Sequence, residues 1–118
     1  MTVVLNSILG IMTTYYYVVA SDRFLFVDEP TDEVIKERIR NYQENEKEID
    51  FWVVKQPSFL ELPELSAIKS QVPTPAAAIV STNKSFITWL KLRLEFVMVG
   101  EFEAADVTRA IASGVTVE

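Results

Sequence analysis

Two charged side chains interrupt apolar runs of this sequence, and they are the first candidates for functional residues. Asp50 lies within the run Ile49–Val54 and is followed directly by Phe51 and Trp52, whereas Arg93 lies within a second apolar run. A charge taken out of water needs a partner. Asp50 and Arg93 therefore either satisfy each other inside the fold or are both offered to another protein. Aromatic rings together with arginine are the side chains that protein interfaces favour.

Two absences remove most catalytic chemistry. The 118 residues contain no His and no Cys, and they carry 11 basic against 17 acidic side chains, for a net charge of −6. These absences exclude His-based triads, thiol catalysis, iron–sulfur clusters and the Glu-x-x-His ligands of carboxylate di-iron centres. The acidic balance argues against binding to a nucleic-acid backbone. We expect neither an enzyme nor a protein with a metal or cofactor of its own.

The second apolar run predicts a long helix over about 84–98, ended by Gly100. At 100° per residue one arc of this helix is an ordinary core stripe, and it contains Phe86, Ile87, Leu90, Leu94, Val97 and Met98. A second apolar arc contains Trp89, Leu92 and Phe96, and Arg93 lies between the two arcs. A helix that covers only one side of a sheet does not need the second arc. It either packs under another helix or faces a partner.

The remaining pattern predicts a small set of alternating elements. The predicted strands are 13–21, 49–54 and 76–80, with a further short strand possible at 24–27. The predicted helices, besides 84–98, are 31–46, a short one that begins near Pro63, and 106–113. In helix 31–46 we expect Val34, Ile35, Ile39 and Tyr42 to face inward, with Lys36, Glu37, Arg38, Arg40 and Asn41 largely opposite.

This order of elements predicts an α+β fold in one small domain. We expect a three- to four-stranded sheet, largely antiparallel or mixed, packed with about four helices. Residues 1–11 carry no charge and are interpreted as an N-terminal extension, and 12–118 as the single αβ domain.

Several segments together resemble a known family. They are Met12–Val18, Asp50–Trp52, Ala78–Lys84 and Phe86–Val97. The chain resembles the family called hypothetical chloroplast reading frame fifty-four, found in oxygenic phototrophs and plastids. The resemblance covers roughly residues 12–113, and residues 1–11 lie outside the family pattern.

The resemblance implies a non-catalytic accessory or assembly protein of chlorophyll biosynthesis. Its partner would be the membrane-associated di-iron oxygenase subunit of the aerobic Mg-protoporphyrin IX monomethyl ester cyclase, whose product is protochlorophyllide. Asp50, Phe51 and Arg93 match the family's partner-binding positions, and we add Trp89 from its place beside Arg93 on the helix. The protein would lie in the cytoplasm or plastid stroma and reach photosynthetic (thylakoid) membranes only through this partner. A homodimer is left open.

The alternative is a protein that binds or delivers a tetrapyrrole in the same pathway. Tyr15, Tyr16, Tyr17 and Trp52 would then form a flat aromatic platform for the pigment. Aromatic side chains of this kind more often fill a core.

Overall fold

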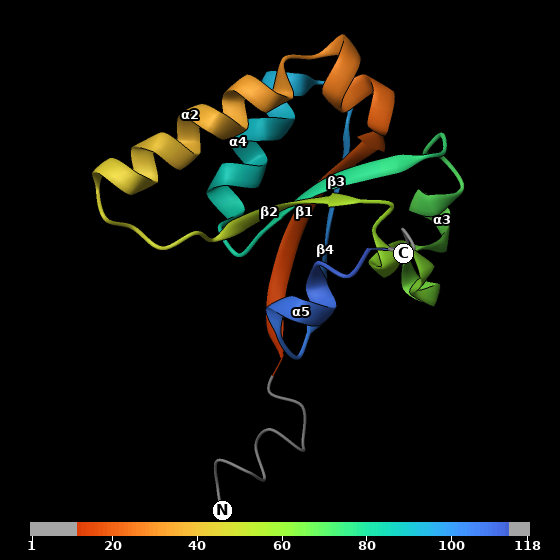
Figure 1. Cartoon of the computed structure of the whole chain (residues 1–118). Coiled ribbons are helices and arrows are strands. Elements are labelled where there is room, and N and C mark those ends of the chain that lie inside the picture. Colours follow the sequence, from red (N-terminus) through yellow and green to blue (C-terminus); the bar gives the residue numbers. More distant parts are fainter. Residues whose placement is uncertain (1–11, 114–118) are drawn as a thin grey trace, which may run out of the picture.

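A computed structural model of the chain describes residues 12–113 and contains one four-stranded antiparallel sheet. Its strands are β1 (Thr13–Ser21), β2 (Phe51–Lys55), β3 (Ala76–Ser81) and β4 (Met98–Ala104). The strand order across the sheet is β2-β3-β1-β4, and every pairing is antiparallel (Figure 1). The α+β fold predicted from the sequence is confirmed.

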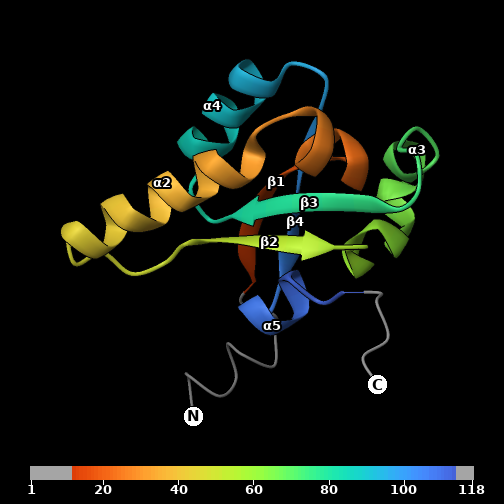
Figure 2. The same cartoon turned by 45° about the horizontal axis from the view of Figure 1, so that its top comes forward.

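Helical segments cover both faces of this sheet. One face carries helix α2 (Thr31–Glu44), helix α4 (Lys84–Leu94) and the π-helical turn η1 (Phe24–Asp28). The other face carries the 3-10 turns η2 (Ser58–Glu61) and η3 (Pro63–Leu65) with the short helices α3 (Ser66–Lys69) and α5 (Val107–Ala110). Figure 2 shows α2 and α4 together on their side of the sheet, with α3 and α5 apart from them. The two central strands are therefore buried on both faces.

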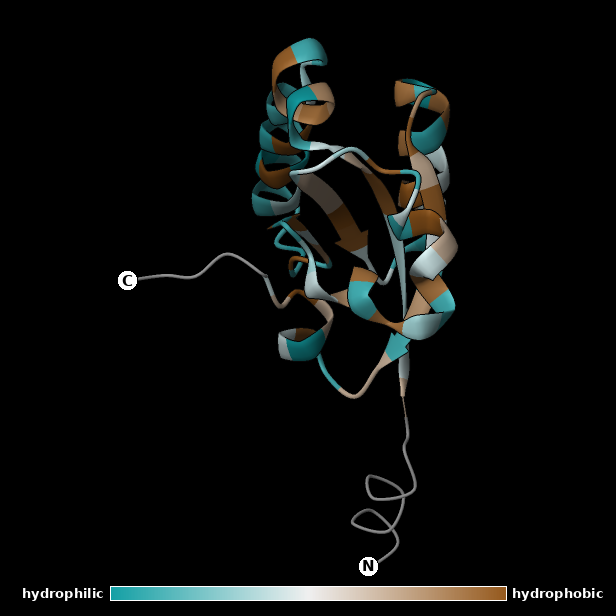
Figure 3. Cartoon of the chain, turned by 90° about the vertical axis from the view of Figure 1, so that its right-hand side faces the viewer, coloured by the Kyte–Doolittle hydropathy of each residue, from teal (hydrophilic) through white to brown (hydrophobic). Residues whose placement is uncertain are grey.

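Strand β1 shows how this burial arises. Tyr17, Val18 and Val19 are each fully buried, because odd-numbered side chains of β1 enter one hydrophobic cluster and even-numbered ones enter the other. Strand β3 is buried along its whole length for the same reason. The strands between the surrounding helices are accordingly coloured mostly hydrophobic in Figure 3. Such strands read as continuous apolar runs, which made both of them predictable from sequence.

The short strand predicted at 24–27 is wrong, because this segment forms the π-helical turn η1. The amide of Phe24 donates to Ser21 Oγ at 3.1 Å, so the chain turns as β1 ends. Leu25 is then fully buried against the helical face of the sheet. An apolar run of four residues does not by itself distinguish a strand from a buried helical turn.

The helix predicted over 84–98 ends earlier than expected, at Leu94. Glu95 has a positive φ of 61°, and a strand, β4, starts three residues later. Gly100 therefore does not end a helix but lies inside β4, opposite Tyr17 of β1. The alternation in β4 was hard to recognise because its exposed side carries Glu101 and Glu103 and its covered side includes a glycine.

The remaining predicted elements hold with small shifts. The segment after Pro63 is helical but is divided between η3 and α3. The last helix is shorter than 106–113, and Asp106 caps it by accepting from the Arg109 amide at 3.0 Å. Residues 1–11 lie outside the described residues. Within 12–113, no helix combines the length and the apolar character needed to cross a membrane.

One close contact joins the edge strand β4 to the centre of the sheet. The ring of Tyr17 lies across Gly100, and a Cβ at Gly100 would collide with Tyr17 Oη and lie 2.7 Å from Tyr17 Cζ. Tyr17 Oη is buried and has no hydrogen-bond partner among the described residues. Glycine is therefore required here by the space that the tyrosine ring occupies.

We predict that Gly100→Ala lowers the free energy of unfolding by about 1–3 kcal/mol, because the added methyl group overpacks the tyrosine ring. Urea denaturation followed by circular dichroism measures the change. Tyr17→Phe should reduce this cost, since it removes the atom closest to the new methyl group. Equal costs in the wild-type and Tyr17→Phe backgrounds would contradict the proposed contact.

The same tyrosine predicts an alkaline limit to stability. Burial raises the pKa of Tyr17 above its ordinary value, which is about 10. Below about pH 10 the tyrosine hydroxyl keeps its proton in both the folded and the unfolded state, and the free energy of unfolding has its full value. As the pH rises further, the unfolded state ionises first, so the free energy of unfolding falls until the folded pKa is passed. Tyr17→Phe should show a shallower fall, measured by urea denaturation across alkaline pH.

Candidate functional site

A groove of about 520 Å³ lies between helices α2 and α4. Its walls are formed by Pro30, Glu33, Val34, Glu37, Arg38, Asn41, Trp89 and Arg93. Two of the four residues singled out from the sequence, Trp89 and Arg93, therefore line it. The other two, Asp50 and Phe51, lie at the start of β2, and their role follows from the contacts below.

Arg93 and Trp89 are available to a partner. The Trp89 side chain is 47% exposed, and its ring stacks on Phe86 with centroids 6.2 Å apart. The side chain of Arg93 is exposed and makes no hydrogen bond or ion pair with the described residues. An arginine fork and an indole ring, both open to solvent on one helix, match the composition of interface hot spots.

The groove is built around Arg38, whose place the sequence analysis got wrong. Arg38 was expected on the polar side of helix 31–46, but its guanidinium carbon lies 3.7 Å from the ring centroid of Phe86. The rings of Tyr42 and Phe51 are 5.0 and 5.6 Å away. A guanidinium over aromatic faces gains about 0.5–2 kcal/mol, more when water is excluded. Arg38 thus fastens α2 to the aromatic residues beneath it.

The carboxylate of Asp50 completes this contact from the side of the sheet. Arg38 Nη2 donates to Tyr42 Oη at 2.9 Å, and Tyr42 Oη donates to Asp50 Oδ1 at 2.7 Å. Lys47 Nζ lies 4.0 Å from Asp50 Oδ2. The alternative in which Asp50 pairs with Arg93 is wrong, because Asp50 is bound by Tyr42 and Lys47 instead.

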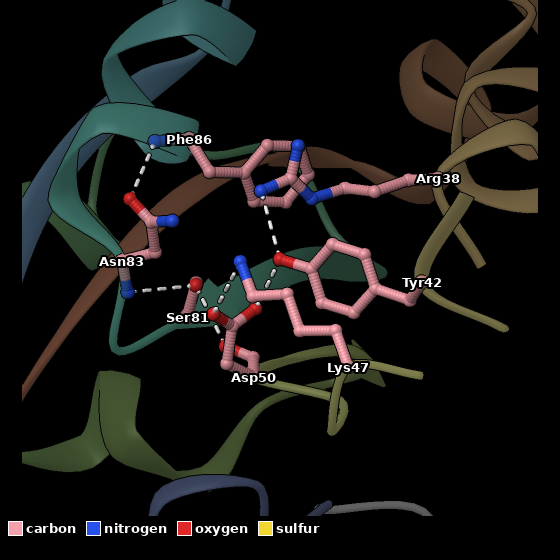
Figure 4. A network of polar contacts seen from close by, with 7 residues as sticks. All are labelled: Arg38, Tyr42, Lys47, Asp50, Ser81, Asn83 and Phe86. Carbon is pink, nitrogen blue, oxygen red and sulfur yellow. Dashed lines mark hydrogen bonds and ion pairs between the residues drawn. The ribbon is translucent and has the colours of Figure 1, made fainter. Parts of the chain in front are cut away.

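The backbone of Asp50 also fixes the start of α4. Its carbonyl accepts from Ser81 Oγ at 2.7 Å and from the Thr82 amide at 3.2 Å. Ser81 Oγ in turn accepts from the Asn83 amide at 2.9 Å, and Asn83 Oδ1 caps α4 by accepting from the Phe86 amide at 3.1 Å. Figure 4 shows the contacts of Tyr42, Lys47 and Ser81 converging on Asp50, with Asn83 linking Ser81 to the start of α4. One residue therefore holds both helices that form the groove.

Phe51 belongs to the core and not to the surface. It is 3% exposed, and its ring contacts Tyr42 edge to face at 5.4 Å and Phe86 at 5.3 Å. Phe51 therefore acts on the groove by supporting the rings under Arg38. Sequence reasoning missed Arg38, although its spacing of four residues before Tyr42, beside the apolar stripe, was a signal that could have found it.

The side chains of the second apolar arc are exposed to solvent. This excludes, among the described residues, the alternative in which the arc packs under another helix. Leu92 is 75% exposed and Phe96 is 79% exposed, and no helix among the described residues packs over them. We call Trp89, Leu92 and Arg93, together with Phe96 just beyond the end of the helix, the outer face of α4. Exposed large apolar side chains that lie together mark interaction surfaces.

The tyrosine platform expected for a pigment is not available. Tyr15 is 4% exposed and Tyr17 is fully buried, and both rings pack against Phe102 in the core. Within residues 12–113 no three acidic side chains gather in a way that could hold a metal ion.

The fold and the site define a small α+β domain with a groove and exposed apolar side chains on one helical layer. The chain belongs to the Ycf54 protein family, whose sequence model matches residues 13–104. It is 61% identical to a Ycf54-like protein of Synechocystis over 93 residues, which are 79% of this chain and 70% of that protein. It is 39% identical to the chloroplastic YCF54 protein of Arabidopsis thaliana over 108 residues, 91% of this chain and 50% of that protein.

Solved structures of this family share the fold. The All0216 protein of Nostoc superposes with a TM-score of 0.84 at 60% identity, covering 90% of this chain and all of that one. The Ycf54 protein of Thermosynechococcus elongatus superposes with a TM-score of 0.83 at 52% identity, covering 89% of this chain and 98% of that one. The family resemblance drawn from the sequence is thus confirmed.

The two kinds of site residue should respond differently to substitution. Tyr42→Phe removes the hydroxyl that joins Arg38 to Asp50, and we predict a loss of about 1–3 kcal/mol in the free energy of unfolding. Arg93→Ala removes no contact and should stay within about 0.5 kcal/mol of wild type. Urea denaturation measures both. A loss for Arg93→Ala as large as that for Tyr42→Phe would show that Arg93 is structural.

Proposed function

We propose that this protein is a non-catalytic accessory factor that binds the di-iron oxygenase subunit of the aerobic Mg-protoporphyrin IX monomethyl ester cyclase. It supports the accumulation and activity of that subunit, and thereby protochlorophyllide formation. The observation that carries the proposal is that Arg93, a partner-binding position by the family resemblance, is exposed and unpaired among the described residues. Trp89 and the apolar residues of the outer face of α4 surround it.

The contacts support a division of roles among the four site residues. Arg93 and Trp89 would meet the partner directly, since both side chains are open to solvent. Asp50 and Phe51 are positioning residues, because they hold α2 and α4 at the distance that forms the groove. Substitution of any of the four is then expected to weaken binding, by two different mechanisms.

The composition is consistent with an accessory role. A chain without His cannot supply the Glu-x-x-His ligands of a carboxylate di-iron centre. The oxygen chemistry would therefore belong wholly to the partner subunit. We propose that the protein reaches photosynthetic membranes through this partner, from the cytoplasm of a cyanobacterium or the stroma of a plastid.

The proposal is tested by affinity capture from detergent-solubilised photosynthetic membranes. Wild-type protein is expected to capture the oxygenase subunit, and Arg93→Ala to lose about tenfold or more of it without a change in thermal stability. Asp50→Ala should lose capture and stability together. Arg109→Ala is the matched control, since Arg109 is an exposed arginine on α5, on the other face of the sheet.

Two results would contradict the proposal. One is failure of the wild-type protein to capture the oxygenase subunit at all. The other is capture by Arg93→Ala equal to that by wild type, which would place the interface elsewhere.

Tetrapyrrole binding remains the second candidate, and one observation favours it. The groove combines the half-exposed ring of Trp89 with the guanidinium groups of Arg38 and Arg93. An aromatic plane beside cations suits a flat pigment that carries a carboxylate. Trp52 and Trp89 are the two tryptophans of the chain, so Trp52→Phe leaves Trp89 as the only indole reporter. Quenching of its fluorescence by micromolar Mg-protoporphyrin monomethyl ester would support this candidate, and no quenching would remove it.

A further inference from the structure

The chain leaves helix α4 through a strained turn. Glu95 has φ 61° and ψ −61°, and the amide of Phe96 donates to the Leu94 carbonyl at 2.7 Å. These values describe a γ-turn with positive φ, a rare and strained conformation. A residue other than glycine stays in such a conformation only where its surroundings impose it, and such residues gather at functional sites.

Lys91 supplies part of that constraint. Its Nζ donates to the carbonyl oxygens of both Glu95 and Val97, at 2.6 and 2.8 Å. The held turn sends two neighbouring side chains in opposite directions. Val97 is 3% exposed and enters the core, whereas Phe96 is 79% exposed. Phe96 is thus fixed in solvent, with one edge-on ring contact to Phe24 at 6.5 Å.

Phe96 adds an exposed apolar side chain just beyond the end of α4, where the Glu95 turn and not helical spacing sets its position. Trp89 and Leu92 are three residues apart on α4, the spacing that places two side chains on one face of a helix. The same spacing lets a second helix pack its own apolar stripe alongside. Beside Leu92 a smaller groove of about 230 Å³ runs toward β4 and is lined by Val99, Lys84 and Lys91.

The charge around this face indicates which helix would fit. Residues 84–94 contain Lys84, Lys91 and Arg93 and no carboxylate, although the whole chain has a net charge of −6 and two carboxylates lie next to this face, Glu95 in the turn and Glu101 in the smaller groove. A second copy of α4 would bring cations against cations. An anionic membrane would meet the carboxylates of Glu33 and Glu37 on the opposite wall of the groove. A protein segment can place a few carboxylates at Lys84 and Arg93 and none opposite Glu33 and Glu37, which a continuous anionic surface cannot do.

We propose that the outer face of α4 docks an amphipathic helix of the partner protein, with Phe96 as its main apolar anchor. The apolar stripe of that helix packs on Trp89, Leu92 and Phe96, and its acidic residues lie toward Lys84 and Arg93. The identity of the partner as the cyclase oxygenase subunit rests on the function proposed above. The chemistry of the docked segment rests on α4 alone.

The test places the photoreactive residue p-benzoylphenylalanine at position 96 of the full chain, in detergent-solubilised photosynthetic membranes. Mass spectrometry then identifies the cross-linked segment. The expected product is a segment of the oxygenase subunit with an apolar helical stripe flanked by Asp or Glu. The control places the same residue at Val53, a 39% exposed position on the edge strand β2, and should give no such product.

Capture by substituted proteins is measured in parallel. Phe96→Ala should reduce capture of the oxygenase subunit about tenfold or more with unchanged thermal stability, whereas Val53→Ala should capture as wild type does. If wild type and Phe96→Ala capture this subunit equally, the inference is overturned while the proposed function stands. If wild type does not capture it, the proposed function fails. The inference then holds only if the cross-linked segment of another protein has the stated pattern.

Three other products overturn the inference outright. Two of them are a cross-link to a second copy of this chain and a cross-linked segment without flanking acidic residues. The third is the absence of any cross-link to protein. Sedimentation with equimolar phosphatidylglycerol and phosphatidylcholine vesicles that Phe96→Ala abolishes would also overturn it, in favour of a membrane surface.

Discussion

The contact between the Arg38 guanidinium and the ring of Phe86 is the interaction on which the groove depends. It joins the two helices directly, because Arg38 belongs to α2 and Phe86 to the first turn of α4. Tyr42 Oη accepts from the same guanidinium and donates to Asp50, which directly precedes β2. A charge held over aromatic faces and tied to a carboxylate through one hydroxyl is directional, so it fixes the spacing of the helices as well as their contact.

This arrangement separates the residues that shape the surface from those that we propose to meet a partner. Asp50 joins α2, β2 and the cap of α4, and Phe51 fills the space below. Arg93 and the apolar residues of the outer face of α4 are attached to this framework and contribute little to it. A loss of binding after substitution of Asp50 would therefore carry a stability component, whereas a loss after substitution of Arg93 reports on the surface alone.

Much of the fold could be predicted from the sequence because its central strands are apolar on both faces. Strand β3 is buried along all six residues, and β1 along most of its length, so periodicity was not needed to find them. The exposure of Trp89 and Leu92 was predictable too, since they cannot face the sheet together with Phe86 and Leu90. Phe96 is also exposed, but because of the Glu95 turn and not through a place on the helix. These predictions rest on local pattern and geometry.

The errors occurred where distant contacts override local pattern. Strand β4 continues an apolar helix in sequence, and only the turn at Glu95 and the pairing with β1 separate the two. Segment 24–28 turns because Ser21 caps it and Leu25 is buried by elements that follow later in the chain. Arg38 resembles a solvated arginine until the rings of Phe51 and Phe86 are brought beneath it.

The central claim is that the helical layer formed by α2 and α4 is the binding surface. Hydrogen–deuterium exchange of this chain, alone and with the purified oxygenase subunit, tests it most directly. The account predicts slower exchange in α4 and the Glu95 turn, and in α2 around Glu33–Asn41, with little change in η2, α3 and the segment up to Ala76. Slower exchange confined to η2 and α3, or no change anywhere, would contradict it.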